Sequence, residues 1–345
     1  MKSYRPLLLL IVLSLFLAAC GKRTIRIDLV PVEDRLTPQV IENGDASLFT
    51  TDQVAMVTVS GLISNSKPKS LLGGGSNPVS DFRETLDAIA NDNAVKAVVL
   101  RIDSPGGTVA ASQMMYTDLL AFKAKTHKPV VVCMMDLCAS GGYYLSCASD
   151  YRVAYPTTVT GSIGVIVETM NFNGTLKKLG IATDNVKSGP NKDMLSPFKL
   201  PADPDHSLSP TDRELMQHLV DQFYAGFKDI VKKSPNHIAD SDWAMVTDGR
   251  VFTGTDALKL GLIDQLGDLD AAITKAKEMA HIKKARIVTY IRSGDTKGSI
   301  YANTPLRSPS AQTQVNMINL NFDLNDLFPQ GQSQFMYIWP GFTGE

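Results

Sequence analysis

Runs of consecutive apolar residues alternate with segments of helical periodicity between residues 53 and 290. The apolar runs occupy 54–59, 94–102 and 129–135, and turn-forming residues bound each of them. Such runs are typical of strands buried on both faces of a parallel sheet. Between them, apolar residues recur every three or four positions, as on one face of an amphipathic helix. The alternation predicts βαβ units and an α/β fold with a mostly parallel sheet covered by helices.

Three capping signals mark predicted helix starts. Asn77-Pro78 and Ser209-Pro210 each combine a capping side chain with proline at the first helical position. Asp268 precedes apolar residues of helical spacing and begins the last predicted helix. We expect the chain to have four regions: a signal peptide (1–19), a polar membrane-proximal spacer (20–52), a globular domain (53–290) and a tail of low periodicity (291–345). For the apolar stretch 335–339 in the tail, local packing is preferred over binding in a groove.

The N-terminal end has the pattern of an export signal. Lys2 and Arg5 precede the uncharged stretch Leu7–Ala19, whose 13 residues are fewer than the roughly 20 that span a bilayer as a helix. The stretch ends in Leu17-Ala18-Ala19-Cys20, which resembles the lipobox of bacterial lipoproteins. That resemblance implies that Cys20 is acylated and tethers the chain to a lipid bilayer outside the cytoplasm, on the inner or outer membrane of a two-membrane cell. The alternative is a plain secretory signal that ends in cysteine by chance.

Composition narrows the function classes. The chain has 345 residues, a formal net charge of −1 and 44% hydrophobic residues, as an ordinary globular protein does. A charge so near zero argues against broad nucleic-acid binding, which needs clustered basic residues. Besides Cys20 there are three cysteines, of which Cys133 and Cys147 are expected to be buried. No spacing suggests a metal or an organic cofactor.

Two segments combine glycine pairs with strand-to-helix transitions. Pro105-Gly106-Gly107 follows a predicted strand, and its glycines can bring backbone N–H groups to an anion or oxyanion, although such a turn can also be purely structural. Ser140-Gly141 lies between a buried strand and a short helix. There Ser140 is either a nucleophile or simply an N-cap, and the pattern leaves both open.

Three further segments stand out. Thr160–Ile166 is a strand punctuated by glycine, and Lys187–Pro197 is a turn-rich loop that displays lysines. The fifth segment, Asp248–Gly254, precedes Leu260–Asp264 and the last helix. In this order the five segments resemble the signal peptide peptidase A family, relatives of ClpP and the crotonases, over residues 54–283. The resemblance implies a ClpP/crotonase-like fold of repeated ββα and βαβ units and a Ser–Lys dyad hydrolase without a cofactor.

The resemblance implies a role for each matching residue. Ser140 matches the nucleophile and Lys192 the general base. Gly107 and Gly141 match the oxyanion-hole donors, with Gly106 as the alternative to Gly107. Ser162 lies in the glycine-rich strand beside the site, where a supporting role is one interpretation and a structural role the other.

A lysine is a base only when it is neutral, so a solvent-exposed Lys192 could not do this work. Short family members are expected to close into homo-oligomeric rings in which a neighbouring subunit supplies the base. The substrates implied are remnant signal peptides and other hydrophobic segments near the membrane.

The same pattern leaves three alternatives: one other catalytic scheme and two other functions. A Ser-His-Asp triad is disfavoured because none of the five histidines lies in one of these motifs. A catalytically inactive scaffold that binds hydrophobic peptides is the main alternative. An acyl-CoA enzyme of the crotonase type is ranked last, because its cofactor belongs to the cytoplasm.

Overall fold

The computed structural model describes residues 36–47, 49–66, 77–199, 208–292, 295–296, 299–301, 306–307, 336–338 and 340. The predicted signal peptide and Cys20 therefore lie outside the described residues. The strands are β1 Thr37–Glu42, β2 Gln53–Ser60, β3 Val95–Ser104, β4 Gly106–Thr108, β5 Val130–Ala139, β6 Tyr151–Ala154, β7 Val159–Gly161, β8 Val251–Thr253, β9 Gln265–Leu266, β10 Arg286–Ile291, β11 Asp295–Thr296, β12 Leu306–Arg307 and β13 Met336–Ile338. The helices are α2 Pro78–Ala90, α3 Val109–Thr126, α4 Gly141–Ser146, α5 Asn173–Lys178, α6 Pro210–Lys233, α7 Trp243–Val246, α8 Gly254–Lys259 and α9 Leu269–Met279.

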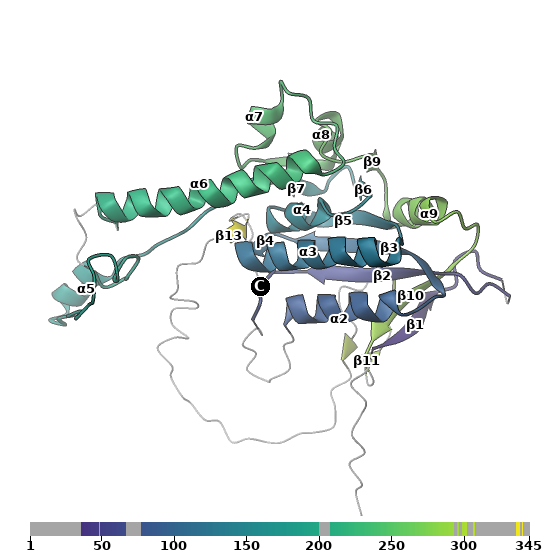
Figure 1. The fold of residues 1–345 in the computed structure, drawn as a ribbon, viewed down its shortest axis with the longest axis horizontal. Helices are drawn as coiled ribbons and strands as arrows, with labels where there is room; N and C mark the ends of the chain where they lie inside the picture. Colours follow the sequence, from purple (N-terminus) through teal and green to yellow (C-terminus); the bar gives the residue numbers. More distant parts are fainter. Residues whose placement is uncertain are drawn as a thin grey trace, which may run out of the picture. The chain divides into compact units, whose positions relative to one another are not determined.

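One large mixed sheet organises the described residues (Figure 1). Its main path runs β1-β10-β2-β3-β5-β6-β9, with β7 beside the end of β5 and β8 beside β7. Every pair from β10 through β9 is parallel, whereas β1 with β10 and β7 with β8 are antiparallel. The predicted α/β fold of the ClpP/crotonase type, with a mostly parallel sheet, is confirmed.

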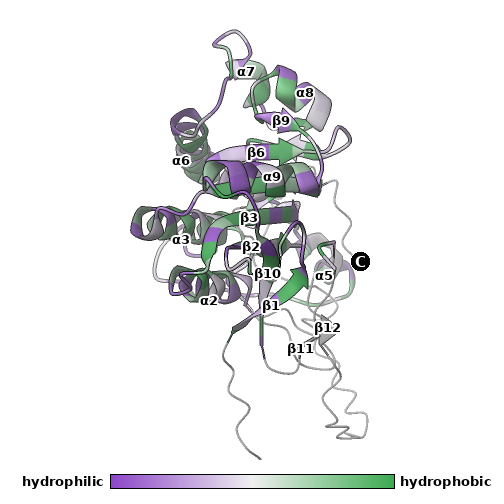
Figure 2. Cartoon of the chain, turned by 90° about the vertical axis from the view of Figure 1, so that its right-hand side faces the viewer, coloured by the Kyte–Doolittle hydropathy of each residue, from purple (hydrophilic) through white to green (hydrophobic). Residues whose placement is uncertain are grey.

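Helices cover both faces of this sheet, and the alternation of side chains along each strand assigns the faces. Ala55 and Val57 of β2 pack with α2, α3 and α4, whereas Val54 and Met56 pack with α9. The same alternation continues along β3 and β5. Burial on both faces explains why these strands read as unbroken apolar runs. Figure 2 shows hydrophobic residues gathered on the strands and hydrophilic residues on the outer sides of the helices.

The three predicted helix starts are confirmed by their hydrogen bonds. The Asn77 side chain accepts from the backbone of Val79 and Ser80, and Pro78 is the first residue of α2. The Ser209 hydroxyl accepts from the Asp212 N–H at the start of α6. The Asp268 carboxylate accepts from the Ala271 N–H at the start of α9. Each cap satisfies a backbone donor that the helix itself leaves without a partner.

Two segments differ from the sequence-based expectations. Strand β1 lies within the region predicted as a spacer, and it forms the antiparallel edge of the sheet against β10. Strand β1 is short and contains Pro38, a residue that an edge strand tolerates. For both reasons its pattern of apolar residues is weak. The segment of the tail at Met336–Ile338 pairs with β4 instead of packing only locally, so the preference for local packing was wrong.

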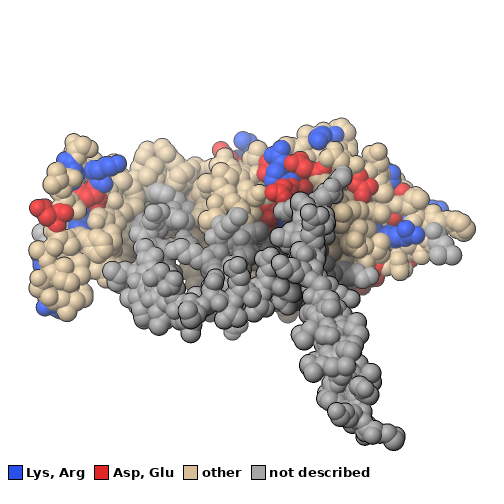
Figure 3. Space-filling view, turned by 90° about the horizontal axis from the view of Figure 1, so that it is seen from below, with Lys and Arg blue, Asp and Glu red and all other residues tan. Residues whose placement is uncertain are grey.

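Other expectations concern single side chains. Cys133 and Cys147 are buried, as predicted, and desolvation raises the pKa of the Cys133 thiol to about 12. Within the described ranges no helix is long and apolar enough to span a bilayer. On the face drawn in Figure 3, the visible charged side chains include both signs in small groups. Among the described residues, Arg292 forms ion pairs with Asp81 and Glu84 of α2.

Candidate active site

Ser140 joins the end of β5 to the start of α4, and its backbone has an unusual conformation. Its φ is 50° and its ψ is −112°, a combination that a residue with a side chain rarely adopts. The Ser140 N–H donates to the Gly161 carbonyl at 2.8 Å, and the Ser140 carbonyl accepts from the Tyr144 N–H at 2.8 Å. Strand pairing on one side and helix α4 on the other therefore hold the conformation.

The Ser140 hydroxyl has no hydrogen-bond partner in the described part of the chain, although its Oγ atom is buried. It also makes no capping bond to α4, so the interpretation of Ser140 as a simple N-cap is not supported. A buried polar atom without a partner costs stability. Such an atom at a strained position suits a reacting group better than a structural one.

Three glycines from two different turns meet beside Ser140. A Cβ on Gly106 would lie 2.6 Å from the amide nitrogen of Gly141, and one on Gly141 would lie 3.1 Å from the amide nitrogen of Gly107. Gly106 has a φ of 101°, which favours glycine. A side chain at either position would fill the space between the two turns. The structure thus brings together the backbone groups that the sequence singled out separately.

The hydrogen bonds of the first turn distinguish Gly106 from Gly107. The Gly106 N–H donates to the Ser104 hydroxyl at 3.0 Å. The Gly106 carbonyl and the Thr108 N–H both bond to Ile63, at 2.8 and 2.9 Å. Because backbone groups alternate in direction along a strand, the N–H of Gly107 points away from Ile63. Of the two glycines, Gly107 is therefore the one whose N–H faces the side opposite to Ile63. Sequence analysis did not identify Ser104, although it directly precedes Pro105-Gly106-Gly107.

Ser162 lies close to Ser140 along the sheet. Strand β7 pairs with β5 so that Gly161 is the partner of Ala139, and each serine is the residue directly after the end of its strand. Ser162 is buried and has a φ of 51°, and its N–H donates to the Arg250 carbonyl at 2.8 Å. The fifth motif, around Asp248–Gly254, thus supports the glycine-rich strand beside the site.

Lys192 is not brought to Ser140 within one chain. It is exposed in a loop in which Asp193 bonds Lys187 at 2.7 Å and lies 3.6 Å from Lys199. The hydrogen bond from Lys187 holds the pKa of Asp193 below its usual value. Lys199 in turn contacts Asp212, in the first turn of α6, at 2.6 Å. Consequently the loop is fastened to the beginning of α6.

The other part of α6 packs near Ser140. Phe227 of α6 contacts Tyr144 of α4, with ring centroids 5.0 Å apart. Fifteen residues separate Asp212 from Phe227 along the helix, which amounts to about 22 Å at the rise of an α-helix. Figure 1 shows α5, which precedes the loop, at the end of α6 that is far from α4. The loop that carries the base candidate is therefore fastened about 22 Å along α6 from the contact with α4.

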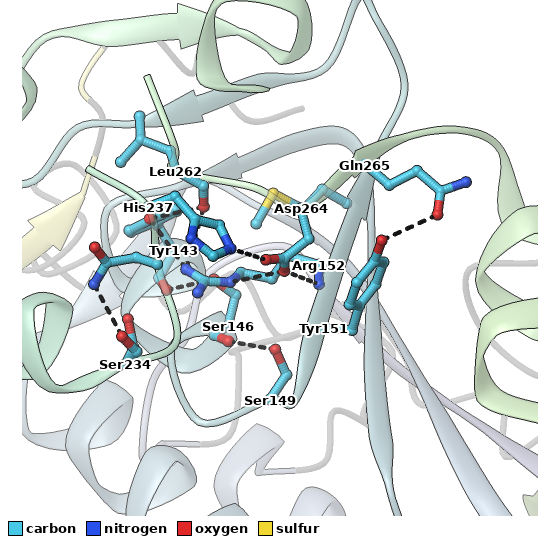
Figure 4. A network of polar contacts seen from close by, with 12 residues as sticks. Tyr143, Ser146, Ser149, Tyr151, Arg152, Ser234, His237, Leu262, Asp264 and Gln265 are labelled. Carbon is cyan, nitrogen blue, oxygen red and sulfur yellow. Dashed lines mark hydrogen bonds and ion pairs between the residues drawn. The ribbon is translucent and has the colours of Figure 1, made fainter. Parts of the chain in front are cut away.

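A network of polar contacts joins α4 to neighbouring segments (Figure 4). The Arg152 guanidinium donates to the Tyr143 hydroxyl and to the Leu262 carbonyl, both at 3.2 Å. The Tyr143 hydroxyl donates to the same carbonyl at 3.0 Å. The Asp264 carboxylate accepts a hydrogen bond from the backbone N–H of Arg152 at 2.7 Å. The same carboxylate lies 3.8 Å from Nε of the Arg152 guanidinium. This arrangement ties the helix that follows Ser140 to the segment before β9.

Comparisons with known proteins agree with this geometry. Residues 122–283 match the model of Peptidase family S49. The chain is 31% identical over 281 residues to a protein of Enterococcus faecium named as a signal peptide peptidase SppA, covering 81% of this chain and 77% of that one. It is 34% identical over 238 residues to a protein of Synechocystis sp. named as a protease, covering 69% of this chain and 78% of that one.

A longer relative shares only part of its length with this chain. Protease 4 of Salmonella typhi is 35% identical over 245 residues, which cover 70% of this chain and 37% of that protein. From the family match and the long alignments to the two shorter relatives, the chain belongs to peptidase family S49, serine proteases that use a Ser–Lys dyad.

Proposed function

We propose that this chain is a membrane-tethered serine endopeptidase in which Ser140 is the nucleophile and Lys192 of a neighbouring copy is the general base. The observation that carries the proposal is the buried Ser140 hydroxyl, which has no partner in the described chain and lies beside the converging amides of Gly107 and Gly141. Those two amides would stabilise the oxyanion that forms when Ser140 attacks a peptide carbonyl. Ser162 directly follows Gly161, whose carbonyl accepts from the Ser140 N–H, and it would support the dyad.

The reaction needs a base that removes the serine proton. As the Ser140 Oγ bonds to the carbonyl carbon, Nζ of Lys192 takes the hydroxyl proton and then passes it to the leaving amine as the C–N bond breaks. Water next attacks the resulting ester. Lys192 accepts a proton from that water, and the returning proton restores the Ser140 hydroxyl when the acid product leaves.

Assembly would solve the separation between the two residues. In a single chain Lys192 is exposed to water, and its loop is attached to the end of α6 that is far from Ser140. The lysine of the same chain therefore meets neither requirement of a general base for Ser140. A neighbouring copy placed head to tail would bring its own loop over Ser140 and bury the lysine. Burial disfavours the charged form of an amine, which a general base requires. A closed ring of such contacts would also restrict access to extended chains.

The proposed substrates are remnant signal peptides and other hydrophobic segments near a membrane. A relative named as a signal peptide peptidase supports this class. Acylation of Cys20 would hold the enzyme at the bilayer where such segments remain. The proposed regions are those of the sequence analysis, with β1 as a folded part of the membrane-proximal segment.

The decisive experiment mixes two inactive variants. Ser140→Ala and Lys192→Ala should each abolish cleavage of a hydrophobic fluorogenic peptide when expressed alone. In rings formed by equal co-expression, a site is active only where an intact serine meets an intact lysine from the neighbour, so about one quarter of wild-type activity should return. Recovery of activity would establish the shared site. If each variant is inactive and the mixture is inactive as well, the dyad does not form between copies.

Labelling by a fluorophosphonate tests the other candidate, an inactive scaffold that binds peptides. The space beside Ser140 fits both candidates, because a peptide-binding protein would also need it. Wild-type protein should become labelled, and Ser140→Ala should not. A wild-type chain that binds peptides but takes up no label would be the scaffold.

A further inference from the structure

The segment Met336–Ile338 is held at the proposed active site as a strand with partners on both sides. On one side β13 runs antiparallel to β4, with Tyr337 opposite Gly107 and Ile338 opposite Gly106. On the other side the N–H and the carbonyl of Met336 bond to Ile166, at 3.0 and 3.1 Å. Bound peptides are recognised in this way when they add a strand to a sheet. Residues 106–108 and Ile166 therefore form the two walls of a groove, which β13 fills.

The carbonyl of Tyr337 lies where a scissile carbonyl is needed. A Cβ on Gly106 would be 2.0 Å from the carbonyl oxygen of Tyr337, 3.0 Å from its carbonyl carbon and 2.6 Å from the amide nitrogen of Gly141. The Tyr337 oxygen and the Gly141 amide thus lie beside the same point. Since Gly107 pairs with Tyr337 across the strands, the carbonyl is next to both proposed oxyanion donors. Its register presents the bond between Tyr337 and Ile338 to the site.

The side chain of Tyr337 enters an aromatic pocket. Its ring stacks on Tyr144 of α4, with centroids 5.0 Å apart, and contacts Phe227 of α6 at 4.7 Å. Tyr116 of α3 packs edge-on against Tyr144 at 5.3 Å and extends the cluster. Only 2% of Tyr337 is exposed. Burial of one aromatic side chain against others contributes more than its apolar area alone.

The pocket also has a polar end. The Tyr337 hydroxyl donates to the Phe223 carbonyl at 2.9 Å. Desolvation raises the pKa of this phenol, so the side chain stays neutral and keeps its donor. The pocket therefore offers the hydroxyl of a tyrosine a hydrogen bond that a phenylalanine cannot make.

We propose that this pocket selects tyrosine or another large aromatic residue immediately before the cleaved bond of a peptide substrate, and that Tyr337 of the tail occupies the pocket as a competing internal peptide. The proposal rests on the proposed function, because it assigns a substrate class to that same site. Packing alone would account for the ring contacts. It does not account for the backbone bonds on both sides or for a carbonyl placed against Gly106 and Gly141.

Binding measurements can test the proposal without catalysis. The probe is a fluorescein-labelled synthetic peptide with the sequence of residues 333–340, and the protein is the full chain carrying Ser140→Ala. Adding Tyr337→Ala should tighten peptide binding by about tenfold or more, because the tethered competitor is lost. Tyr337→Phe should tighten it by a smaller factor, since the ring remains while the bond to Phe223 is lost. A peptide with alanine in place of its tyrosine should bind about tenfold more weakly or worse.

The matched control is Tyr301→Ala, which removes an exposed tyrosine between β11 and β12 and should leave the affinity unchanged. Thermal unfolding of every variant identifies loss of the fold. If Tyr337→Phe and Tyr337→Ala both bind the probe as the parent chain does, the tail is not a competitor and the proposal is wrong. Equal binding of the tyrosine and alanine peptides would also overturn it. In either case fluorophosphonate labelling of Ser140 would still decide the proposed function by itself.

Discussion

The guanidinium of Arg152 and the hydroxyl of Tyr143 share a hydrogen bond of 3.2 Å in the interior of the protein. Both side chains are almost completely buried, and Tyr143 is only three residues beyond Ser140. Because Arg152 also lies near Asp264, the charge is compensated where water cannot reach it. The contact ties α4, which follows Ser140 and Gly141, to the segment before β9.

Replacing Tyr143 by phenylalanine tests the role of that contact. The hydroxyl accepts from Arg152 and donates to Leu262, so its removal leaves a buried donor without one partner. We expect Tyr143→Phe to lower the free energy of unfolding by about 1–3 kcal/mol and to reduce kcat more than it raises KM. Tyr151→Phe is the matched control, because the Tyr151 hydroxyl bonds to Gln265 at a partly exposed site. Urea unfolding and peptide cleavage measure the two effects, and equal losses in both variants would contradict the positioning role.

Gly141→Ala tests the space between the two glycine turns. The new Cβ would lie 2.4 Å from the Ser112 hydroxyl and 3.1 Å from the amide nitrogen of Gly107, so it would force the turns apart. We expect kcat/KM to fall by a factor on the order of a hundred or more, the usual cost of a displaced oxyanion donor. The control is Gly226→Ala in the middle of α6, where a Cβ meets nothing within 4 Å.

The control should behave in the opposite way for stability. Alanine in an α-helix is favoured over glycine by roughly 1 kcal/mol, so Gly226→Ala should raise the unfolding temperature and keep its activity. A fully active Gly141→Ala enzyme would show that the convergence of the turns does not serve the reaction.

Acid should release the loop that carries Lys192. Burial by itself raises the pKa of Asp212. The hydrogen bonds from Lys199 and Ser209 lower this pKa by a larger amount, so it lies below its usual value. A lowered carboxyl pKa contributes stability that is present above the unfolded-state value, near 3.9, and is lost as pH falls through the folded-state value. Stability should therefore decline below about pH 5.

Asp212→Asn separates this contribution from general acid unfolding. At pH 7 the variant should be less stable than the wild type by about 1–2 kcal/mol, because Lys199 loses a partner that is nearly buried. The difference should shrink toward zero as the wild-type carboxylate becomes protonated. Asp256→Asn removes an exposed pair with Lys259 and should change little at any pH. A constant difference across the pH range would show that the effect is not electrostatic.

Sequence analysis identified the groups at the Ser140 site because each is encoded locally. Gly107 and Ser140 follow neighbouring parallel strands, and the carboxyl ends of such strands meet at one edge of a sheet. Their convergence could therefore be expected from strand-and-turn patterns alone. The same patterns left open whether Ser140 was a cap or a nucleophile, since only its dihedral angles and its unbonded hydroxyl distinguish the two.

The remaining features depend on contacts that no local pattern records. Tyr337 pairs with Gly107 across most of the chain, and a three-residue strand carries too few residues to show a period. Phe227 belongs to an apolar stripe of α6 that reads as ordinary core, and its part in the pocket follows only from the presence of Tyr337. Lys192 could be recognised by resemblance, but its partner lies in another copy under the proposed assembly.

Cys20→Ser should separate membrane attachment from catalysis. If the Cys20 thiol carries lipid, serine at this position cannot be acylated, and the enzyme should move from the membrane fraction to the soluble fraction after export. Each buried methylene of an acyl chain contributes about 0.8 kcal/mol to membrane binding, so the loss of the chains should shift the distribution almost completely. Cys147→Ala, a change at a buried cysteine, should leave the protein in the membrane fraction. Activity toward a soluble fluorogenic peptide should persist in the released enzyme, whereas retention of Cys20→Ser in the membrane would mean that another contact holds it.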